Sequence, residues 1–400
     1  MLNRAYNSLI NEHFNEYRQM VFISGPRQVG KTTISKISSK KVIYFNWDNQ
    51  EHRLLIRSGP NNLIKSFNLD SIENIGVRLV FDEIHKYSKW KEFLKGFFDT
   101  YGDNYKILVT GSSRLNVFKK GGDSLMGRYF PYRIHPLSVG ELLNDDKRDK
   151  EISRPKKLSD DIFEQLFKFS GFPEPFLKAN TRFYNIWKRL RIEQVFNEDL
   201  RDISRIQELK GIEDFAKLIV NQTGQLFNSS SFSNLLNVSV DTVRRWSKLL
   251  SDLYYVFFIK PWYSNVPKSL RKQPKVYMWD WSLIEDKGAK FENFIASHLL
   301  KSVNFWTDSG LGNYELFFLR DKYKREVDFL IAKDNIPWFL VEVKSSKNAR
   351  LSPSIEYFAD ILKVKHSFQV VYDMEYVDRD CFSINMPVKV PALTFLSQLI

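Results

Sequence analysis

The chain has 400 residues, of which 43% are hydrophobic and 27% are charged, and this ordinary globular composition excludes a disordered or collagen-like chain. Its 60 lysines and arginines outnumber 47 acidic residues and give a net charge of +13, which favours a polyanionic partner such as nucleic acid or an anionic membrane surface, or simply marks a cationic surface. A single cysteine excludes an intramolecular disulfide, and no apolar run approaches the ~18 residues that span a bilayer, so we expect a cytoplasmic protein without a membrane partner.

Residues 1–135 alternate short apolar runs with helical patterns. The runs MVFIS, KVIYFNW, RLVFDE and YKILVTGSS are separated by segments such as KTTISKISS. This alternation predicts a parallel sheet with crossover helices. A chain of this length also has room for further domains, since domains typically contain roughly 100 to 200 residues.

The sequence GPRQVGKT follows the first apolar run and matches the pattern G-x-x-x-x-G-K-[ST]. In such a loop, backbone N–H groups wrap around phosphates, Lys31 can reach the β and γ phosphates, and Thr32 can bind Mg²⁺. We therefore expect a nucleotide-binding loop before a helix. Its contacts would come from Gly25, Pro26, Arg27, Gln28, Val29, Gly30, Lys31, Thr32 and Thr33.

Two later strands are expected to bring polar side chains to the same sheet edge. Asp82 would hold Mg²⁺, directly or through water, and Glu83 would orient or deprotonate the attacking water. The alternative is a strand that ends in two solvated acids. The run KILVTGSS delivers Ser112 and Ser113, either of which could sense the γ phosphate, although TGSS is also good turn chemistry.

The segment after these strands carries an arginine and then becomes helical. Arg128, in LMGRYFPYR, could reach a nucleotide in its own or a neighbouring subunit, or it could be a surface arginine. The charge-dense stretch 144–157 interrupts the strand pattern and indicates a linker or exposed loop. Apolar residues then recur three and four apart over residues 159–210, which predicts a small helical domain.

Helix, short helix, helix and strand follow in that order between residues 211 and 261, which predicts a winged helix-turn-helix with Ser239 as an N-cap. Arg244, Arg245 and Lys248 would lie on its recognition helix and contact DNA phosphates. The alternative is that this basic helix packs against an acidic flank of its own chain. Further cations follow nearby: Lys260, Lys268, Arg271, Lys272 and Lys275.

The last part of the chain contains the pattern D…E-x-K on neighbouring predicted strands. Asp328 precedes Glu342 and Lys344, which share one face of a strand because side chains alternate. Two carboxylates can bind Mg²⁺ while a lysine positions the water that attacks a phosphodiester. Glu292 lies on an upstream helix. Taken alone the pattern is weak, since exposed strand faces often carry such charges.

These motifs together resemble a known family. GPRQVGKT, YFNWD, FDEIHKY, TGSS, LMGRYFPYRIHPLSVGEL and SGFPEP occur in that order and resemble bacterial and archaeal AAA-type P-loop ATPases with a C-terminal nuclease-like domain. His85 departs from the pattern, which more often has glutamine. The resemblance implies ATP and Mg²⁺ as cofactors. It assigns ATP hydrolysis to Lys31, Thr32, Asp82, Glu83, Ser112 or Ser113, and Arg128.

The C-terminal part resembles the PD-(D/E)xK nuclease superfamily. Asp328, Glu342 and Lys344 match its core, and Glu292 takes the place of its helical acid. The resemblance implies metal binding by Glu292, Asp328 and Glu342 and a catalytic role for Lys344. Such domains can also persist as binding modules without cutting.

We therefore expect an α/β protein with four parts: a P-loop AAA-type ATPase core (1–135), a helical lid domain (136–208), a winged helix-turn-helix (209–265) and a restriction-endonuclease-like PD-(D/E)xK domain (266–400). The expected function is a Mg²⁺-dependent ATPase that binds DNA and couples ATP hydrolysis to DNA processing, with metal-dependent cleavage by the last domain left open. The alternative is a nucleotide-controlled switch or scaffold whose last domain binds a partner without cutting. The sequence leaves open whether the chain forms a homo-oligomer.

Overall fold

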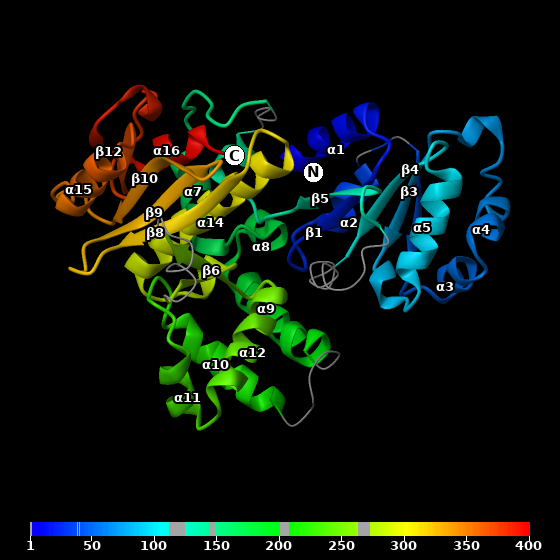
Figure 1. Cartoon of the computed structure of the whole chain (residues 1–400), viewed down its shortest axis with the longest axis horizontal. Coiled ribbons are helices and arrows are strands. Elements are labelled where there is room, and N and C mark those ends of the chain that lie inside the picture. Colours follow the sequence, from blue (N-terminus) through cyan, green and yellow to red (C-terminus); the bar gives the residue numbers. More distant parts are fainter. Residues whose placement is uncertain are drawn as a thin grey trace. The chain divides into compact units, whose positions relative to one another are not determined.

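The chain forms two compact units, Met1–His135 and Pro136–Ile400. The structure is a computed structural model (Figure 1), and it describes residues 2–37, 39, 41–111, 125–143, 149–200, 208–262 and 273–400. Each unit has a β-sheet of its own. None of the helices in these described ranges combines the length and apolarity that crossing a membrane would require.

The sheet of the first unit has the strand order β2-β3-β4-β1-β5, and all neighbouring strands are parallel. This confirms the parallel sheet predicted for the N-terminal part. Ser24, Asp82 and Thr110 end three adjacent strands and therefore lie at one edge of the sheet. The strands are β1 (Met20–Ser24), β2 (Val42–Asn46), β3 (Arg78–Asp82), β4 (Lys106–Thr110) and β5 (Tyr129–Arg133).

Helices pack around this sheet (Figure 1). The ring of Phe81 on β3 stacks on Phe45 of β2 and contacts the edge of Phe97 of α5, within one aromatic core. Helix α2 packs against β3 and β4. The helices are α1 (Ala5–Glu16), α2 (Lys31–Ile37), α3 (Gln50–Arg57), α4 (Pro60–Ser66) and α5 (Trp90–Tyr101), with 3₁₀ turns η1 (Ile72–Asn74) and η2 (Ile84–Lys86).

The second unit begins with two groups of helices. The first group is α6 (Val139–Leu142), α7 (Asp160–Phe169), α8 (Pro173–Lys178), α9 (Thr181–Gln194) and the π-helical turn η4 (Val195–Asp199). The second group is α10 (Leu209–Val220), α11 (Ser229–Leu236) and α12 (Val240–Asp252). The Ser239 side chain accepts a hydrogen bond from the backbone N–H of Thr242 and caps α12, as its sequence predicts.

The sheet of the second unit has the strand order β12-β11-β10-β9-β8-β6-β7. Strands β8, β9 and β10 are antiparallel neighbours, and β6 and β7 form an antiparallel pair beside β8. Residue 265, the boundary expected from sequence, therefore falls between two strands of one sheet. The strands are β6 (Val256–Pro261), β7 (Lys275–Met278), β8 (Tyr314–Arg320), β9 (Glu326–Lys333), β10 (Ile336–Lys344), β11 (His366–Val371) and β12 (Pro387–Pro391).

Helices cover both faces of this sheet. Helix α15 packs on the face that carries Leu330 and Leu340. On the other face, Phe339 and Phe368 contact Phe395 of α16. The remaining elements are η6 (Trp281–Leu283), α14 (Lys287–Asp308), α15 (Pro353–Leu362), η7 (Cys381–Ser383) and α16 (Ala392–Gln398).

Candidate functional site

The phosphate-binding motif lies between β1 and α2. Gly25 has a φ of +150°, and a Cβ at this position would lie 2.3 Å from the backbone oxygen of Ile134. Only glycine fits there, because any side chain would clash with the backbone of the segment after β5. Gly30, with a φ of +98°, also adopts a backbone conformation that favours glycine. The motif thus has the strand, loop and helix context that phosphate binding requires.

The side chain of Lys31 is buried within this loop. Its Nζ atom donates hydrogen bonds to the backbone oxygens of Gly25, at 2.8 Å, and Pro26, at 2.7 Å. A buried ammonium group is a strong donor and carries a full charge. The loop therefore holds a cation among the backbone groups that would surround bound phosphates.

Three hydroxyl groups surround the carboxylate of Asp82. It accepts hydrogen bonds from the hydroxyls of Tyr44 and Thr110, and from the Thr32 hydroxyl at 3.3 Å. Burial, followed by the hydrogen bond to Asp82, raises the pKa of Tyr44 and keeps its hydroxyl protonated. Carboxylate and hydroxyl oxygens are the ligands that Mg²⁺ prefers. Thr32 and Asp82 therefore offer the oxygen atoms that a Mg²⁺ ion would need at this position.

Glu83 follows Asp82 directly and has a left-handed backbone, with a φ of +56°. Burial raises the pKa of its carboxyl, an effect that nearby Lys86 opposes. Its Oε2 atom lies 3.5 Å from Nε2 of His85 and 3.8 Å from Nζ of Lys86. Such a group at the same edge as the phosphate-binding loop can accept a proton. Sequence analysis gave His85 no role, yet the structure places it against the candidate base.

The arginine proposed from sequence does not join these residues in its own subunit. The backbone oxygen of Arg128 accepts from the N–H of Met20, the first residue of β1. The loop follows the last residue of β1, about 13 Å away along a five-residue strand. The Arg128 guanidinium is instead paired with Asp99, with Nε 2.7 Å from Oδ1 and a second bond of 3.0 Å. Arg133 is the arginine at the loop edge, since it pairs with Ser24.

Ser112 and Ser113 lie outside the described residues. The strand that leads to them ends at Thr110, whose hydroxyl binds Asp82, and the N–H of Gly111 donates to the backbone oxygen of Ile23 at 3.3 Å. The sensor role therefore stays a prediction.

Sequence reasoning missed Arg4, which supports the phosphate-binding loop from the N-terminal segment. Its guanidinium donates to the backbone oxygen of Val29, at 2.8 Å, and to that of His135, at 2.6 Å. The side chain is buried, with 5% of the residue exposed. These bonds join the loop to the end of the segment after β5. No local motif marks Arg4, because both partners are distant in sequence.

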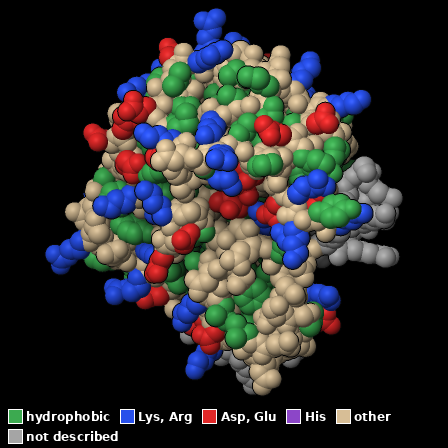
Figure 2. Space-filling view, turned by 90° about the vertical axis from the view of Figure 1, so that its left-hand side faces the viewer, with side chains coloured by type: hydrophobic (Ala, Val, Ile, Leu, Met, Phe, Trp, Pro, Cys, Tyr) green, Lys and Arg blue, Asp and Glu red, His purple; other side chains and the backbone are tan. Residues whose placement is uncertain are grey.

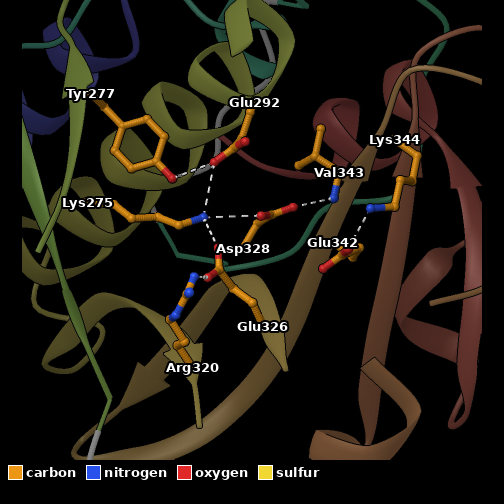
Figure 3. Close-up of polar contacts among 9 residues, drawn as sticks. All are labelled: Lys275, Tyr277, Glu292, Arg320, Glu326, Asp328, Glu342, Val343 and Lys344. Carbon is orange, nitrogen blue, oxygen red and sulfur yellow. Dashed lines mark hydrogen bonds and ion pairs between the residues drawn. The ribbon is translucent and has the colours of Figure 1, made fainter. Parts of the chain in front are cut away.

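A second constellation lies in the C-terminal unit and is built around a buried lysine (Figure 3). The Nζ atom of Lys275, on β7, lies 3.4 Å from Oε1 of Glu292, 2.7 Å from Oε1 of Glu326 and 3.3 Å from Oδ1 of Asp328. The Tyr277 hydroxyl donates to Glu292 at 2.7 Å. We call the three acids Glu292, Glu326 and Asp328 the carboxylate cluster, and the Lys275 ammonium lies among them. Glu292 and Asp328 were expected from sequence, whereas Glu326 and Lys275 were not.

The E-x-K pair lies beside this cluster on β10. Lys344 binds Oε1 of Glu342 at 2.7 Å, as expected for two side chains on one face of a strand. The backbone N–H of Val343 donates to Oδ2 of Asp328 at 2.9 Å and joins the pair to the cluster. The second oxygen of Glu342 is buried and has no hydrogen-bond partner.

Burial has a large effect on these acids. It raises the pKa of Glu292 to about 7, with the Asp328 charge adding to the increase and Lys275 opposing it. Burial likewise raises the pKa of Glu342 to about 7, again helped by Asp328 and opposed by Lys344. The cluster is still reachable from solvent, since the Glu292 and Glu326 side chains are 22% and 23% exposed. Figure 2 shows acidic side chains gathered in a hollow among basic ones.

Lys275 is not available to DNA phosphates, although its place in the sequence predicted that it would be. Its side chain is only 3% exposed and is already paired with acidic residues. It is buried because β7 is hydrogen-bonded to β6 and brings the lysine beside α14 and β9.

Among the described residues, no three acidic, histidine or cysteine side chains are arranged to hold a metal ion.

The cations of α12 remain on the surface, and each has an acidic neighbour. Arg244 lies 3.1 Å from Asp241, Arg245 lies 2.8 Å from Glu208, and Lys248 is paired with Asp252. Their side chains are 57–67% exposed. Exposed pairs of this kind contribute little stability and exchange partners readily. Helix α12 is therefore less positive than its lysines and arginines alone suggest.

Comparison with known proteins agrees with the fold of the first unit. Residues 17–143 match the family model described as an AAA domain. The first unit has the fold and motifs of an AAA-type P-loop ATPase. Residues 160–287 and 287–389 of the chain match two domains of unknown function, DUF8612 and DUF4143. The junction between these two matches falls at Lys287, the first residue of α14.

Similar curated proteins are uncharacterized. A Mycobacterium tuberculosis protein is 21% identical over 351 residues, which cover 84% of this chain and 72% of that protein, and a Mycobacterium bovis protein gives the same values. A Haemophilus influenzae protein is 23% identical over 366 residues, which cover 85% of this chain and 86% of that protein.

Solved structures similar to this chain include the Aeropyrum pernix ORC1 protein in complex with DNA, which is 12% identical and has a TM-score of 0.34. The similarity covers 75% of this chain and 94% of that chain. AMPPCP-bound DnaA from Aquifex aeolicus has 11% identity and a TM-score of 0.31, with 61% and 86% covered. These scores are too low to transfer an overall fold from either protein.

Proposed function

We propose that the AAA unit binds ATP with Mg²⁺ and hydrolyses it. The observation that carries this proposal is the meeting of Lys31, Thr32, Asp82 and Glu83 at one edge of the parallel sheet. Motif and geometry agree there, since the loop with Lys31 and Thr32 and the adjacent acids Asp82 and Glu83 come from separate parts of the sequence.

Each residue has a separate role in this proposal. The Lys31 ammonium binds the β and γ phosphates, and Thr32 and Asp82 would hold Mg²⁺, which when bound neutralises developing phosphate charge. Glu83 orients the attacking water and accepts its proton. Burial raises the pKa of Glu83, which makes its carboxylate a better proton acceptor than an exposed one.

Steady-state ATP hydrolysis and nucleotide binding test this proposal. Glu83→Gln should still bind ATP but hydrolyse it about 10² to 10⁴ times more slowly, the usual contribution of a general base. Lys31→Ala should lose binding, whereas Lys65→Ala, which removes an exposed lysine of α4, should behave as the parent. A Glu83→Gln protein with parental turnover would contradict the assigned base.

We also propose that the second unit binds DNA through α10, α11, α12 and the β6–β7 pair, which would form a winged helix-turn-helix. Three helices followed by an antiparallel strand pair support this interpretation, and Arg244, Arg245 and Lys248 supply surface cations on α12. These cations would exchange their acidic partners for phosphates. Binding would be directed mainly at the DNA backbone and would weaken with salt.

Salt-dependent binding of a DNA duplex tests the proposed surface. The triple variant Arg244→Ala, Arg245→Ala, Lys248→Ala should reduce the slope of log affinity against log salt by about 2 to 3, because each lost phosphate contact removes about 0.9. A control triple variant with the same charge change in the AAA unit should keep the parental slope; it replaces Lys65, Lys89 and Lys95. Equal slopes for both variants would exclude α12 as the contact.

The part of the second unit that carries the carboxylate cluster has two candidate roles. Metal-dependent DNA cleavage coupled to ATP hydrolysis is supported by the contacts of Asp328, Glu342 and Lys344. The alternative, a nucleotide-controlled switch or scaffold that does not cut, is favoured by Lys275, whose ammonium already lies among the three carboxylates. Cutting that is lost in Lys344→Ala would favour the nuclease. Intact DNA under all nucleotide and metal conditions would favour the switch and a protein partner.

A further inference from the structure

The carboxylate cluster binds a cation that belongs to the chain itself. Lys275 has a side chain only 3% exposed, and its ammonium contacts three carboxylates within 3.4 Å. Figure 3 shows the ammonium between Glu292, Glu326 and Asp328, which come from α14 and β9. Bringing so many charges out of water is costly unless they neutralise one another. The lysine therefore does for these acids what a bound metal ion would otherwise do.

A divalent ion does not fit the cluster while Lys275 is in place. Mg²⁺ requires oxygen ligands at about 2.0–2.1 Å in near-octahedral geometry. An ammonium group at 2.7–3.4 Å from the same oxygens occupies that space and repels a second cation.

A separate feature shows that the site has unused capacity for a cation. Glu342 is 6% exposed, and its Oε2 atom is buried without a hydrogen-bond partner. Lys344 donates its hydrogen bond to the other oxygen of Glu342, Oε1. Leaving a buried carboxylate oxygen unsatisfied is unfavourable. The backbone N–H of Val343, the residue after Glu342, donates to Asp328 at 2.9 Å, so Glu342 lies on the strand segment that contacts the cluster.

We propose that Lys275 is a built-in counter-ion that competes with divalent metal ions for the carboxylate cluster. The cluster then binds a metal ion only when the Lys275 ammonium is removed or withdrawn. Glu292, Glu326 and Asp328, whose oxygens surround the ammonium, supply the ligands in that case, and Glu342 lies beside them. This competition concerns the C-terminal unit alone and holds whether or not the AAA unit hydrolyses ATP.

Titration of the nucleotide-free full chain with Mn²⁺, followed by calorimetry and by the electron paramagnetic resonance signal of free Mn²⁺, tests the competition. Lys275→Met keeps the aliphatic stem and removes the charge. It should bind one more Mn²⁺ ion than the parent. The affinity of the carboxylate cluster for Mn²⁺ should be at least about tenfold higher in the variant than in the parent, because a neighbouring cation is gone. The double variant Lys275→Met, Asp328→Asn should lose that ion. Lys344→Met is the matched control and should gain no site, because Lys275 remains.

Stability gives an independent readout. Lys275→Met leaves Glu292 and Asp328 without the Lys275 ammonium, while Glu326 keeps its ion pair with Arg320. The melting temperature of the variant should therefore fall and should recover with Mn²⁺, while that of the parent should not change with Mn²⁺. A folded Lys275→Met protein that binds no additional Mn²⁺ would overturn the proposal. If this variant does not fold, the parent still decides: Mn²⁺ binding more than about threefold tighter in the parent than in Asp328→Asn would show that the metal enters despite Lys275.

Discussion

At the residue scale, single buried groups position each candidate site. Arg4 is the example in the AAA unit, because its guanidinium joins Val29 in the phosphate-binding loop to His135. Replacing Arg4 with methionine keeps a long side chain but leaves both backbone oxygens without that donor. A buried acceptor left unsatisfied costs about 1–3 kcal/mol, so the free energy of unfolding should fall by that amount and the loop should be held less firmly.

Urea denaturation and ATP binding measure the two effects of Arg4→Met. We expect weaker ATP binding even under conditions where the variant is fully folded. Arg57→Met, on the surface end of α3, is the control and should change neither quantity. Parental ATP affinity in folded Arg4→Met would mean that the loop keeps its shape without this contact.

The buried carboxyl of Glu342 predicts a dependence of stability on pH. Its pKa is raised to about 7, mainly by burial, from a model-peptide value near 4.5. The folded state therefore binds the proton more tightly than the unfolded state, and stability falls as pH rises from about 4.5 to about 7. Glu342→Gln mimics the neutral form. It should remove part of this decrease, on the order of 1–3 kcal/mol, and be the more stable protein at pH 8.

Chemical denaturation of both proteins at pH 5 and pH 8 would show this difference. Glu315→Gln replaces an exposed carboxyl of β8 and should leave the parental pH dependence unchanged. If parent and Glu342→Gln lose the same stability between the two pH values, the Glu342 carboxyl does not titrate in this range.

At the element scale, a buried ion pair joins α6 to α14. The ammonium of Lys301 binds the carboxylate of Glu141 and donates to the backbone oxygen of Pro136 at 3.0 Å, and the paired side chains are 2% and 1% exposed. Removing one partner leaves the other charge buried and uncompensated. We expect Glu141→Gln to lower the free energy of unfolding by about 3–5 kcal/mol.

Comparison of the buried ion pair with an exposed one shows whether burial causes the expected loss of stability. Glu193→Gln breaks the exposed Arg189–Glu193 pair on α9 and should cost less than about 1 kcal/mol. The double change Glu141→Leu, Lys301→Met removes both buried charges and should recover most of the lost stability. Equal effects of Glu141→Gln and Glu193→Gln in urea denaturation would show that the buried pair does not hold α6 to α14.

Sequence was informative where function depends on a local pattern. The parallel sheet and the loop containing Lys31 follow from short runs, because strand, glycines and lysine are adjacent in the chain. The residues that complete each site come from far away: Lys275 is 53 residues from Asp328, and Arg4 is 131 residues from His135. Such contacts arise from strand order and packing, and neither periodicity nor spacing encodes them.

At the scale of the whole molecule, the place of Arg128 bears on assembly. Arg128 lies at the edge of the AAA sheet where β1 begins, opposite the phosphate-binding loop, so it cannot act on the nucleotide of its own subunit. If Arg128 stabilises transferred phosphate charge, it does so on the nucleotide of a neighbouring copy of the chain. This arrangement predicts that ATP hydrolysis per subunit rises with protein concentration.

Mixing two inactive proteins tests this prediction. Lys31→Ala subunits cannot bind ATP but present an intact Arg128, and Arg128→Ala subunits bind ATP but lack the arginine. If Arg128 acts on the nucleotide of a neighbouring subunit, some interfaces in the mixture place the Arg128 of a Lys31→Ala subunit against ATP bound to an Arg128→Ala subunit. The ATPase activity of the mixture should then exceed that of either protein alone. Arg133→Ala should not be rescued in this way, because Arg133 pairs with Ser24 beside the loop of its own subunit. Full activity of Arg128→Ala alone, at every concentration, would instead limit Arg128 to its ion pair with Asp99.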